Sequence, residues 1–306
     1  MSTQPFPTPS PGAIPRAMAI PAPDDGDLPA TYGQRALWFL DRLAPGNPAY
    51  VIAGAVRVIG ELDAAALRRA AAGLVARHPA LRTTFLAGPA GPLQRIAPAG
   101  AVDFQELQGA ATWEEMPGRL AAVAFAPFDL AAGPLLRLAV LPLADGGYAL
   151  ALAIHHIVAD FWSLSILVRE LGVLYARAVA AGAEEAEEDA GLPPPPDLSP
   201  GDLARREEEL LAGCQGERLW QYWREALAGA PLTLDLPTDR PRPPVQGYRA
   251  GACTFELPAE VLSALRRATR RQGATLYMGL LAAFELLLAR TAGQERLIVG
   301  CPTTGR

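Results

Sequence analysis

Apolar residues recur along this chain with two spacings, one typical of strands and one typical of helices. Residues 148–154 form an almost continuous apolar run, as expected for a central strand that is covered on both faces. The later segment 164–181 has helical spacing, because Leu164, Leu167 and Leu171 recur every three or four positions. Short apolar runs predict further strands at residues 50–59, 81–86, 94–96, 135–143, 252–257 and 297–300. Further helices are expected at residues 34–43, 63–78, 112–124, 202–211, 219–223, 258–269 and 275–290.

Turn and capping residues mark the ends of several of these elements. Asp63 can cap the helix that follows it, and Pro79 ends that helix. The Asp145-Gly146-Gly147 sequence between two apolar runs is a hairpin signal. Because strands and helices alternate along the chain, the sequence predicts an α/β architecture.

Two segments without periodicity divide the chain. Residues 1–28 are rich in Pro, Ser, Ala and Asp, and we expect them to form a disordered leader. Residues 183–200 combine an acidic run with several prolines. This composition predicts a linker between two units, 29–182 and 201–306.

The two predicted units share a local pattern. Residues 56–78 and residues 253–273 both contain a strand, a short acidic turn and an amphipathic helix rich in Ala, Leu and Arg. This recurrence indicates two related halves. The second unit ends soon after a strand that has no partner in its own half, so we expect that half to be incomplete.

Composition and charge exclude several classes of protein. The 306 residues are 50% hydrophobic, which allows a sizeable core, and a net charge of -5 without a basic stripe argues against a nucleic-acid partner. The three cysteines are too far apart for a disulfide framework or a zinc site, which fits a reducing cytoplasm. No secretory signal is visible, and the apolar stretch 276–289 is shorter than the roughly 20 residues of a membrane span. The sequence therefore predicts a cytoplasmic protein without a nucleic-acid or membrane partner.

The histidines give the clearest chemical signal. His155 and His156, two of the three histidines, directly follow the apolar run, and Asp160 comes four residues later. Loops at strand ends often carry catalytic groups, and histidine can transfer protons near neutral pH. If the strand continues through the pair, one imidazole points into the core and the other into a cleft, so the two cannot share a metal ion. Ser163 lacks a Gly-x-Ser-x-Gly turn and is expected to start a helix, while a purely structural role for both histidines is the alternative.

Five segments, in order, resemble motifs of the condensation domains of nonribosomal peptide synthetases, which belong to the chloramphenicol acetyltransferase-like superfamily. The histidine pair and Asp160 resemble that family's His-His-x-x-x-Asp-Gly motif. The other four segments are 31–38 (Thr-Tyr-Gly-Gln-Arg-Ala-Leu-Trp), 77–85 (Arg-His-Pro-Ala-Leu-Arg-Thr-Thr-Phe), 237–241 (Pro-Thr-Asp-Arg-Pro) and 298–306 (Ile-Val-Gly-Cys-Pro-Thr-Thr-Gly-Arg). The resemblance extends from about Leu28 to the last residue.

The resemblance implies a fold and a reaction. It implies two chloramphenicol acetyltransferase-like lobes in a V arrangement, the second incomplete, with a tunnel between them. The reaction would join an acyl or peptidyl thioester to an aminoacyl amine in antibiotic or other secondary metabolism. Both substrates would be carried on phosphopantetheine arms of upstream and downstream peptidyl carrier domains, next to an adenylation domain. The chain itself would bind no cofactor.

The resemblance also implies roles for individual residues. His156 would face the tunnel and either accept a proton from the attacking amine or orient it. His155 would face inward and hold the turn. Asp160 would form a buried ion pair with Arg306 or, as second choice, with Arg82, and capping of the following helix is compatible with that pairing.

The sequence departs from the family pattern at two places. Phe161 replaces the usual Gly after Asp160 and is expected to narrow the tunnel or change the turn. Trp162 and Ser163 are further candidates for lining it. The fourth motif, normally Tyr-x-Asp followed by an aromatic residue and a Trp, retains only Asp202.

Two other functions stay open at this point. One is a related O- or N-acyltransferase that uses acyl-CoA or a free alcohol. The other is an inactive truncated remnant that docks carrier domains without turnover, which the incomplete second half and Phe161 would favour.

Overall fold

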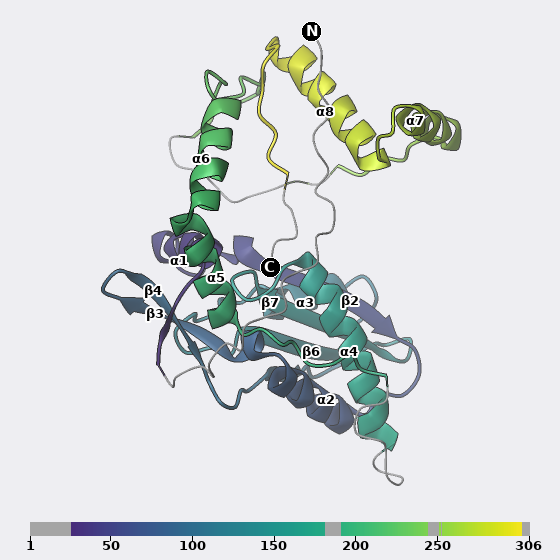
Figure 1. The fold of residues 1–306 in the computed structure, drawn as a ribbon. Helices are drawn as coiled ribbons and strands as arrows, with labels where there is room; N and C mark the ends of the chain where they lie inside the picture. The colour runs from purple at the N-terminus through teal and green to yellow at the C-terminus, as the bar shows by residue number, and fades with distance from the viewer. Residues whose placement is uncertain (1–25, 181–190, 244–250, 252, 302–306) are drawn as a thin grey trace.

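The computed structural model describes residues 26–180, 191–243, 251 and 253–301 (Figure 1). Within these residues, the first half, up to residue 180, contains two sheets with seven strands. The second half, from residue 191 onward, contains helices and irregular segments. The predicted leader lies almost entirely outside the described residues.

The main sheet has the strand order β2–β7–β6–β5. Its strands are β2 (Val51–Val58), β5 (Asp103–Glu106), β6 (Leu136–Pro142) and β7 (Tyr148–His155). Strand β7 pairs antiparallel with both β2 and β6, while β5 joins β6 in parallel. The predicted hairpin and the interior position of the apolar run in β7 are therefore confirmed.

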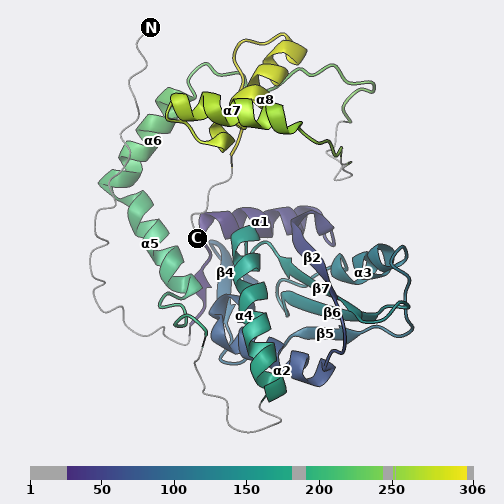
Figure 2. The same ribbon diagram turned by 90° about the vertical axis from the view of Figure 1, so that its right-hand side faces the viewer.

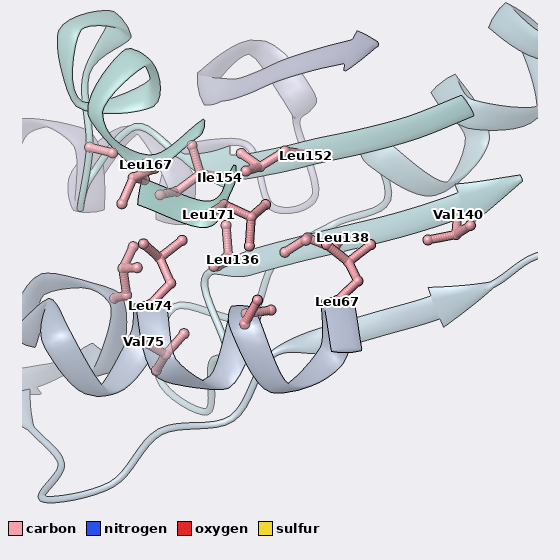
Figure 3. Packing of buried hydrophobic residues seen from close by; sticks show 14 residues of the cluster. Leu67, Leu74, Val75, Leu136, Leu138, Val140, Leu152, Ile154, Leu167 and Leu171 are labelled. Carbon is pink, nitrogen blue, oxygen red and sulfur yellow. The ribbon is translucent and has the colours of Figure 1, made fainter. Parts of the chain in front are cut away.

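Two helices cover one face of the main sheet. Helices α2 (Ala64–Arg77) and α4 (Phe161–Ala180) pack on each other and on the sheet (Figures 1 and 2). The Asp63 carboxylate accepts a hydrogen bond from Ala66 N–H at 2.9 Å, so Asp63 caps α2 as predicted. Between these elements, branched apolar side chains interdigitate in a continuous core (Figure 3). Its large members include Leu67, Leu74, Val75, Leu136, Leu138, Val140, Leu152, Ile154, Leu167 and Leu171.

Helix α3 (Met116–Ala124) packs on β6 and β7, in a second apolar cluster. A buried arginine, Arg137 of β6, fixes the end of this helix. Its Nε donates to Asp103 Oδ2 at 2.5 Å, and its Nη1 donates to the carbonyl oxygens of Val123 and Ala126, each at 2.9 Å. Arg137 thus links β6 to β5 and satisfies carbonyl groups at the C-terminal end of α3.

The smaller sheet has the order β1–β4–β3 and lies beside helix α1. Its strands are β1 (Leu28–Pro29), β3 (Thr83–Gly88) and β4 (Gly91–Ile96), and α1 is Tyr32–Leu43. A third apolar cluster around Phe85 joins this sheet to α1 and to the turn after β7.

Helix α5 (Pro200–Ala212) follows the linker but packs on the first half. The buried Gln94 side chain of β4 donates to the carbonyl oxygens of Pro29 at 2.9 Å and Pro200 at 3.2 Å. It therefore joins β1 to the start of α5. Residues 191–199 form an irregular segment before α5, and most of the acidic run of the predicted linker lies outside the described residues.

The remaining helices are α6 (Cys214–Ala226), α7 (Ala259–Arg271) and α8 (Leu276–Ala292). Helix α6 leads away from the sheets, and α7 packs against α8 (Figure 2). Among the described helices, none has by itself the length and apolar composition to cross a membrane. Helices α7 and α8 meet these two criteria only when they are taken together, as a pair bent by 106°.

Two predicted strands of the second half are wrong. Residues 253–257 and 297–300 are irregular, and Ile298 is 44% exposed. A strand needs a hydrogen-bonded neighbour, and no strand pairing is present in the described part of this half. The predicted recurrence between the halves therefore holds for the helix α7 but not for the strand before it.

Candidate active site

The histidine pair lies at the end of β7. His155 is the last residue of the strand, and its N–H donates to Leu135 O at 3.1 Å. His156 begins the following turn, and its N–H donates to Tyr50 O at 2.8 Å. The side chain of His155 is buried, whereas His156 is half-buried. The main sheet thus fixes the backbone at both histidines.

His155 forms part of the support of this turn. Its Nδ1 accepts a hydrogen bond from Ile157 N–H at 3.2 Å, and its ring meets Phe128 edge-on at 6.2 Å between centroids. Burial, with a smaller effect from the charge of His156, lowers the pKa of His155 to about 4. At neutral pH the ring is therefore uncharged, and an imidazole that carries its proton on Nε2 can accept at Nδ1. This geometry suits a structural role.

Asp160 caps the N-terminus of α4. Its Oδ1 accepts from Ser163 N–H at 2.7 Å and from Ser163 Oγ at 2.6 Å, and Asp160 N–H donates to Ser163 Oγ at 3.2 Å. This reciprocal pattern is a capping box, which is the predicted alternative for Asp160. Of the two predicted ion-pair partners, Arg82 donates from Nη1 to the carbonyl oxygen of Ala97. Arg306 lies outside the described residues.

Two aromatic residues occupy the first turn of α4. Phe161 is helical, so this position does not require the backbone freedom of glycine, and the turn is that of an ordinary capped helix. The side chains of Phe161 and Trp162 are 79% and 66% exposed. They are therefore available to a molecule that binds beside the histidine turn, whereas Ser163 is half-buried in the cap.

Gln34 also belongs to this site, although it was not among the site residues predicted from the sequence. Thr31 caps α1 by accepting from Gln34 N–H at 3.2 Å, and Gln34 Oε1 accepts from Thr31 N–H at 2.9 Å. The Nε2 of Gln34 donates to Ile157 O at 3.4 Å, immediately after His156. The Thr-x-x-Gln spacing was a visible signal for the cap, but not for the contact with the turn.

A cavity of about 600 Å³ lies beside the same turn. Helix α1 contributes Gln34, the turn contributes Ile157 and Val158, and α5 contributes Leu203 and Arg206. This size is within the range of small-molecule sites. Among the described residues, no group of three or more His, Cys, Asp or Glu side chains could hold a metal ion.

The arrangement places an imidazole close to a local positive potential. Helix α4 begins five residues after His156, and the N-terminus of a helix carries a partial positive charge. A half-buried imidazole near such a terminus can accept a proton while developing negative charge is stabilised nearby.

Comparison with known sequences identifies relatives along almost the whole chain. The family model described as Condensation domain matches residues 24–306. The chain is 41% identical to phosphinothricin tripeptide synthetase PhsB of Streptomyces viridochromogenes, over 94% of this chain and 24% of that protein. It is also 41% identical to one of the linear gramicidin synthase proteins of Brevibacillus parabrevis, over 94% of this chain and 4% of that protein. The chain thus spans a small part of the length of these relatives.

Solved structures share the fold. The X-domain from teicoplanin biosynthesis matches with a TM-score of 0.76 and 31% identity, over 89% of this chain and 59% of that chain. The first condensation domain of the CDA synthetase matches with a TM-score of 0.66 and 24% identity, over 88% of this chain and 63% of that chain, which shows the fold alone. The predicted chloramphenicol acetyltransferase-like α/β fold is confirmed. The chain belongs to the condensation domain family of nonribosomal peptide synthetases.

Proposed function

We propose that this chain catalyses amide-bond formation between a carrier-bound acyl or peptidyl thioester and a carrier-bound aminoacyl amine. The family supplies the reaction class, because its curated relatives are peptide synthetases. The observation that carries the proposal is the fixed turn after β7. His156 starts this turn, and its backbone N–H donates to Tyr50 O. The N–H of the next residue, Ile157, donates to His155 Nδ1.

In the proposed reaction, the amine nitrogen attacks the carbonyl carbon of the thioester. The C–N bond forms, the C–S bond breaks, and the sulfur leaves as a thiolate. Nε2 of His156 accepts the proton that the nitrogen loses and passes it to the leaving sulfur. Histidine is suited to this transfer, because an imidazole can both accept and release a proton near neutral pH. Orientation of the amine by His156 is the alternative role, since aminolysis of a thioester is already favourable.

The other residues of the turn support this chemistry. His155 stays neutral, and its Nδ1 accepts a hydrogen bond from Ile157 N–H. Asp160 fixes the start of α4, whose partial positive charge would stabilise the oxyanion of the tetrahedral intermediate. A further ion pair between Asp160 and Arg306 stays a prediction from the family resemblance.

The proposed substrates are delivered by partner domains. Upstream and downstream peptidyl carrier domains would present them on phosphopantetheine arms, and an adjoining adenylation domain would supply the activated amino acid. Phe161 and Trp162 are proposed to line the path of one arm, with Ser163 behind them. The exposure of both aromatic side chains supports this assignment.

Binding of a partner protein without catalysis is a second candidate function. The observation that favours it is the 31% identity to the teicoplanin X-domain, which has also been solved as a complex with OxyB. A chain with this fold can therefore serve as a docking surface in a related pathway. Phe161 in place of the usual glycine of the histidine motif is compatible with this alternative.

Replacement of His156 tests the proposed reaction. We expect His156→Ala to lower amide formation from two carrier-bound substrates by about 100-fold or more, because general acid–base catalysis contributes about 10²–10⁴-fold. The thermal melting temperature should stay unchanged. His78→Gln, which removes the histidine at the end of α2, is the matched control and should retain activity.

Three results would contradict the proposal. An unchanged product yield with His156→Ala would exclude the assigned role. Turnover of acyl-CoA or of a free alcohol without carriers would favour the related acyltransferase. Carrier binding without any product in the unmodified protein would favour the docking function.

A further inference from the structure

Gln34 connects helix α1 to the turn that carries His156, although it lies 123 residues from Ile157 in sequence. Its side chain is 8% exposed, and both ends of its amide are engaged. Oε1 accepts from Thr31 N–H at 2.9 Å, and Nε2 donates to Ile157 O at 3.4 Å. The first of these contacts belongs to the helix cap, whereas the second is a tertiary contact.

The hydrogen bonds around His156 hold the peptide groups on both of its sides. Before it, His156 N–H donates to Tyr50 O at 2.8 Å. After it, Ile157 N–H donates to His155 Nδ1 at 3.2 Å, and Ile157 O accepts from Gln34. Strand β7 and its neighbour thus hold one side of the turn, and α1 holds the other.

Two observations indicate that the Gln34 contact matters for the position of the turn. The cavity of about 600 Å³ is lined by both Gln34 and Ile157, so the turn borders open space where Gln34 contacts it, although the Ile157 side chain is fully buried in the cluster around Phe85. Helix α1 is itself held in place, because Tyr32 N–H donates to Glu207 Oε2 of α5 at 2.7 Å. Gln34 therefore extends from an anchored helix to the side of the turn that borders the cavity.

We infer that Gln34 is a positioning residue for His156. Its amide holds the Ile157 carbonyl group and thereby sets the direction in which the turn presents the imidazole of His156. The expected effect of Gln34 on the rate of catalysis rests on the proposed function, whereas its expected effect on the orientation of the His156 imidazole does not. A misplacement of about 1 Å at a reacting group can slow a reaction by about 100-fold.

Substitution of Gln34 by Glu separates positioning from capping. A carboxylate at this position still accepts from Thr31 N–H, as in the usual Thr-x-x-Glu capping box, but it cannot donate to Ile157 O. Gln34→Met removes both interactions. Gln94→Met is the matched control, because Gln94 is also buried and its side-chain amide also donates to the backbone, here to the carbonyl groups of Pro29 and Pro200.

Kinetics provide the first readout. In the amide-forming assay with carrier-bound substrates, Gln34→Glu and Gln34→Met should lower kcat by about 10-fold to 100-fold and change KM by less than about twofold. Gln94→Met should keep kcat within about twofold, even where its melting temperature falls as far as that of Gln34→Met. An equal loss of kcat in Gln94→Met, or no loss in Gln34→Glu, would overturn the inference.

Histidine NMR provides a second readout that does not depend on turnover. The chain has three histidines, so the imidazole signals of His78, His155 and His156 can be assigned from single substitutions. Gln34→Glu should shift or broaden the His156 signals and leave those of His78 in place, whereas Gln94→Met should leave all His156 signals in place. Unchanged His156 signals in Gln34→Glu would refute the positioning role. If the unmodified protein forms no amide bond, the proposed function fails, and the NMR comparison still decides the role of Gln34.

Discussion

Helices α2 and α8 are both rich in alanine and leucine, yet six residues of α2 are buried and no residue of α8 is. Helix α2 packs on the main sheet and on α4, whereas α8 packs against α7. Leu74 of α2 is 0% exposed, and Leu287 of α8 is 60% exposed. The difference shows that an apolar helix gains stability from the elements that cover it and not from its composition.

The same contrast separates the two halves of the molecule. The first half closes its core from several sides, with α2 and α4 on the main sheet and α3 packed on β6 and β7. This rigid platform carries the histidine turn. In the second half, the described residues supply helices without a sheet to cover them. We therefore expect the halves to respond differently to equivalent substitutions.

Truncation of one leucine in each half should give the largest difference. Leu74→Ala should lower the free energy of unfolding by about 2–5 kcal/mol, because it leaves a cavity in the main core. Leu287→Ala should change it by less than about 0.5 kcal/mol, because the side chain is mostly exposed. Urea denaturation of both variants measures the two effects. An equal loss in Leu287→Ala would mean that α8 is covered in solution, and the comparison would not hold.

Removal of one arginine in each half should give a smaller difference. Arg137→Met should cost about 2–3 kcal/mol, since it leaves the half-buried Asp103 and the carbonyl groups at the end of α3 without their donor. Arg266→Met on the exposed face of α7 should cost less than about 0.5 kcal/mol. Thermal unfolding of the two variants provides the measurement. Similar melting temperatures for both would show that Arg137 contributes little.

Between pH 7 and pH 5, protonation of histidine should act on the first half alone, because the second half has no histidine. His155 has a pKa of about 4 when folded and about 6.5 when unfolded, so the unfolded chain binds its proton first as the pH falls. The contribution of His155 is therefore complete above about pH 6.5 and is lost progressively toward pH 4. At pH 5, the part of this contribution that is lost amounts to about 2 kcal/mol of unfolding free energy. Urea titrations at pH 7 and pH 5 measure the loss of unfolding free energy between the two pH values. This loss should be about 2 kcal/mol smaller in His155→Gln than in the unmodified protein. An equal loss in both proteins would argue against a neutral buried His155.

Periodicity and capping predict much of the first half. The apolar run of β7 and the Asp63 cap of α2 both correspond to observed elements. Strand β5 was missed because Asp103, Gln105 and Glu106 are polar, and only its pairing with β6 makes it a strand. The apolar run 297–300 was expected to be a buried strand, but burial depends on a partner that its own composition does not specify.

The residues of the site were also predictable only where their signal is local in sequence. His155 and His156 were found because they are adjacent and follow an apolar strand, which is a local feature. The capping role of Asp160 was also accessible, since its partner Ser163 is three residues away. The contact between Gln34 and Ile157 joins distant segments, so spacing in the sequence carries no trace of it.

The attachment of α5 to the first half determines where chains of this kind can be divided and recombined. A chain that ended at residue 182 would lose Pro200 and Glu207, and with them one of the two acceptors for the Gln94 amide and the acceptor for Tyr32 N–H. A chain that ended after Ala212, where α5 ends, would keep both. When segments are exchanged between related synthetases, a junction after α5 would therefore preserve more contacts of the half that carries the histidine turn than a junction within the proline-rich linker.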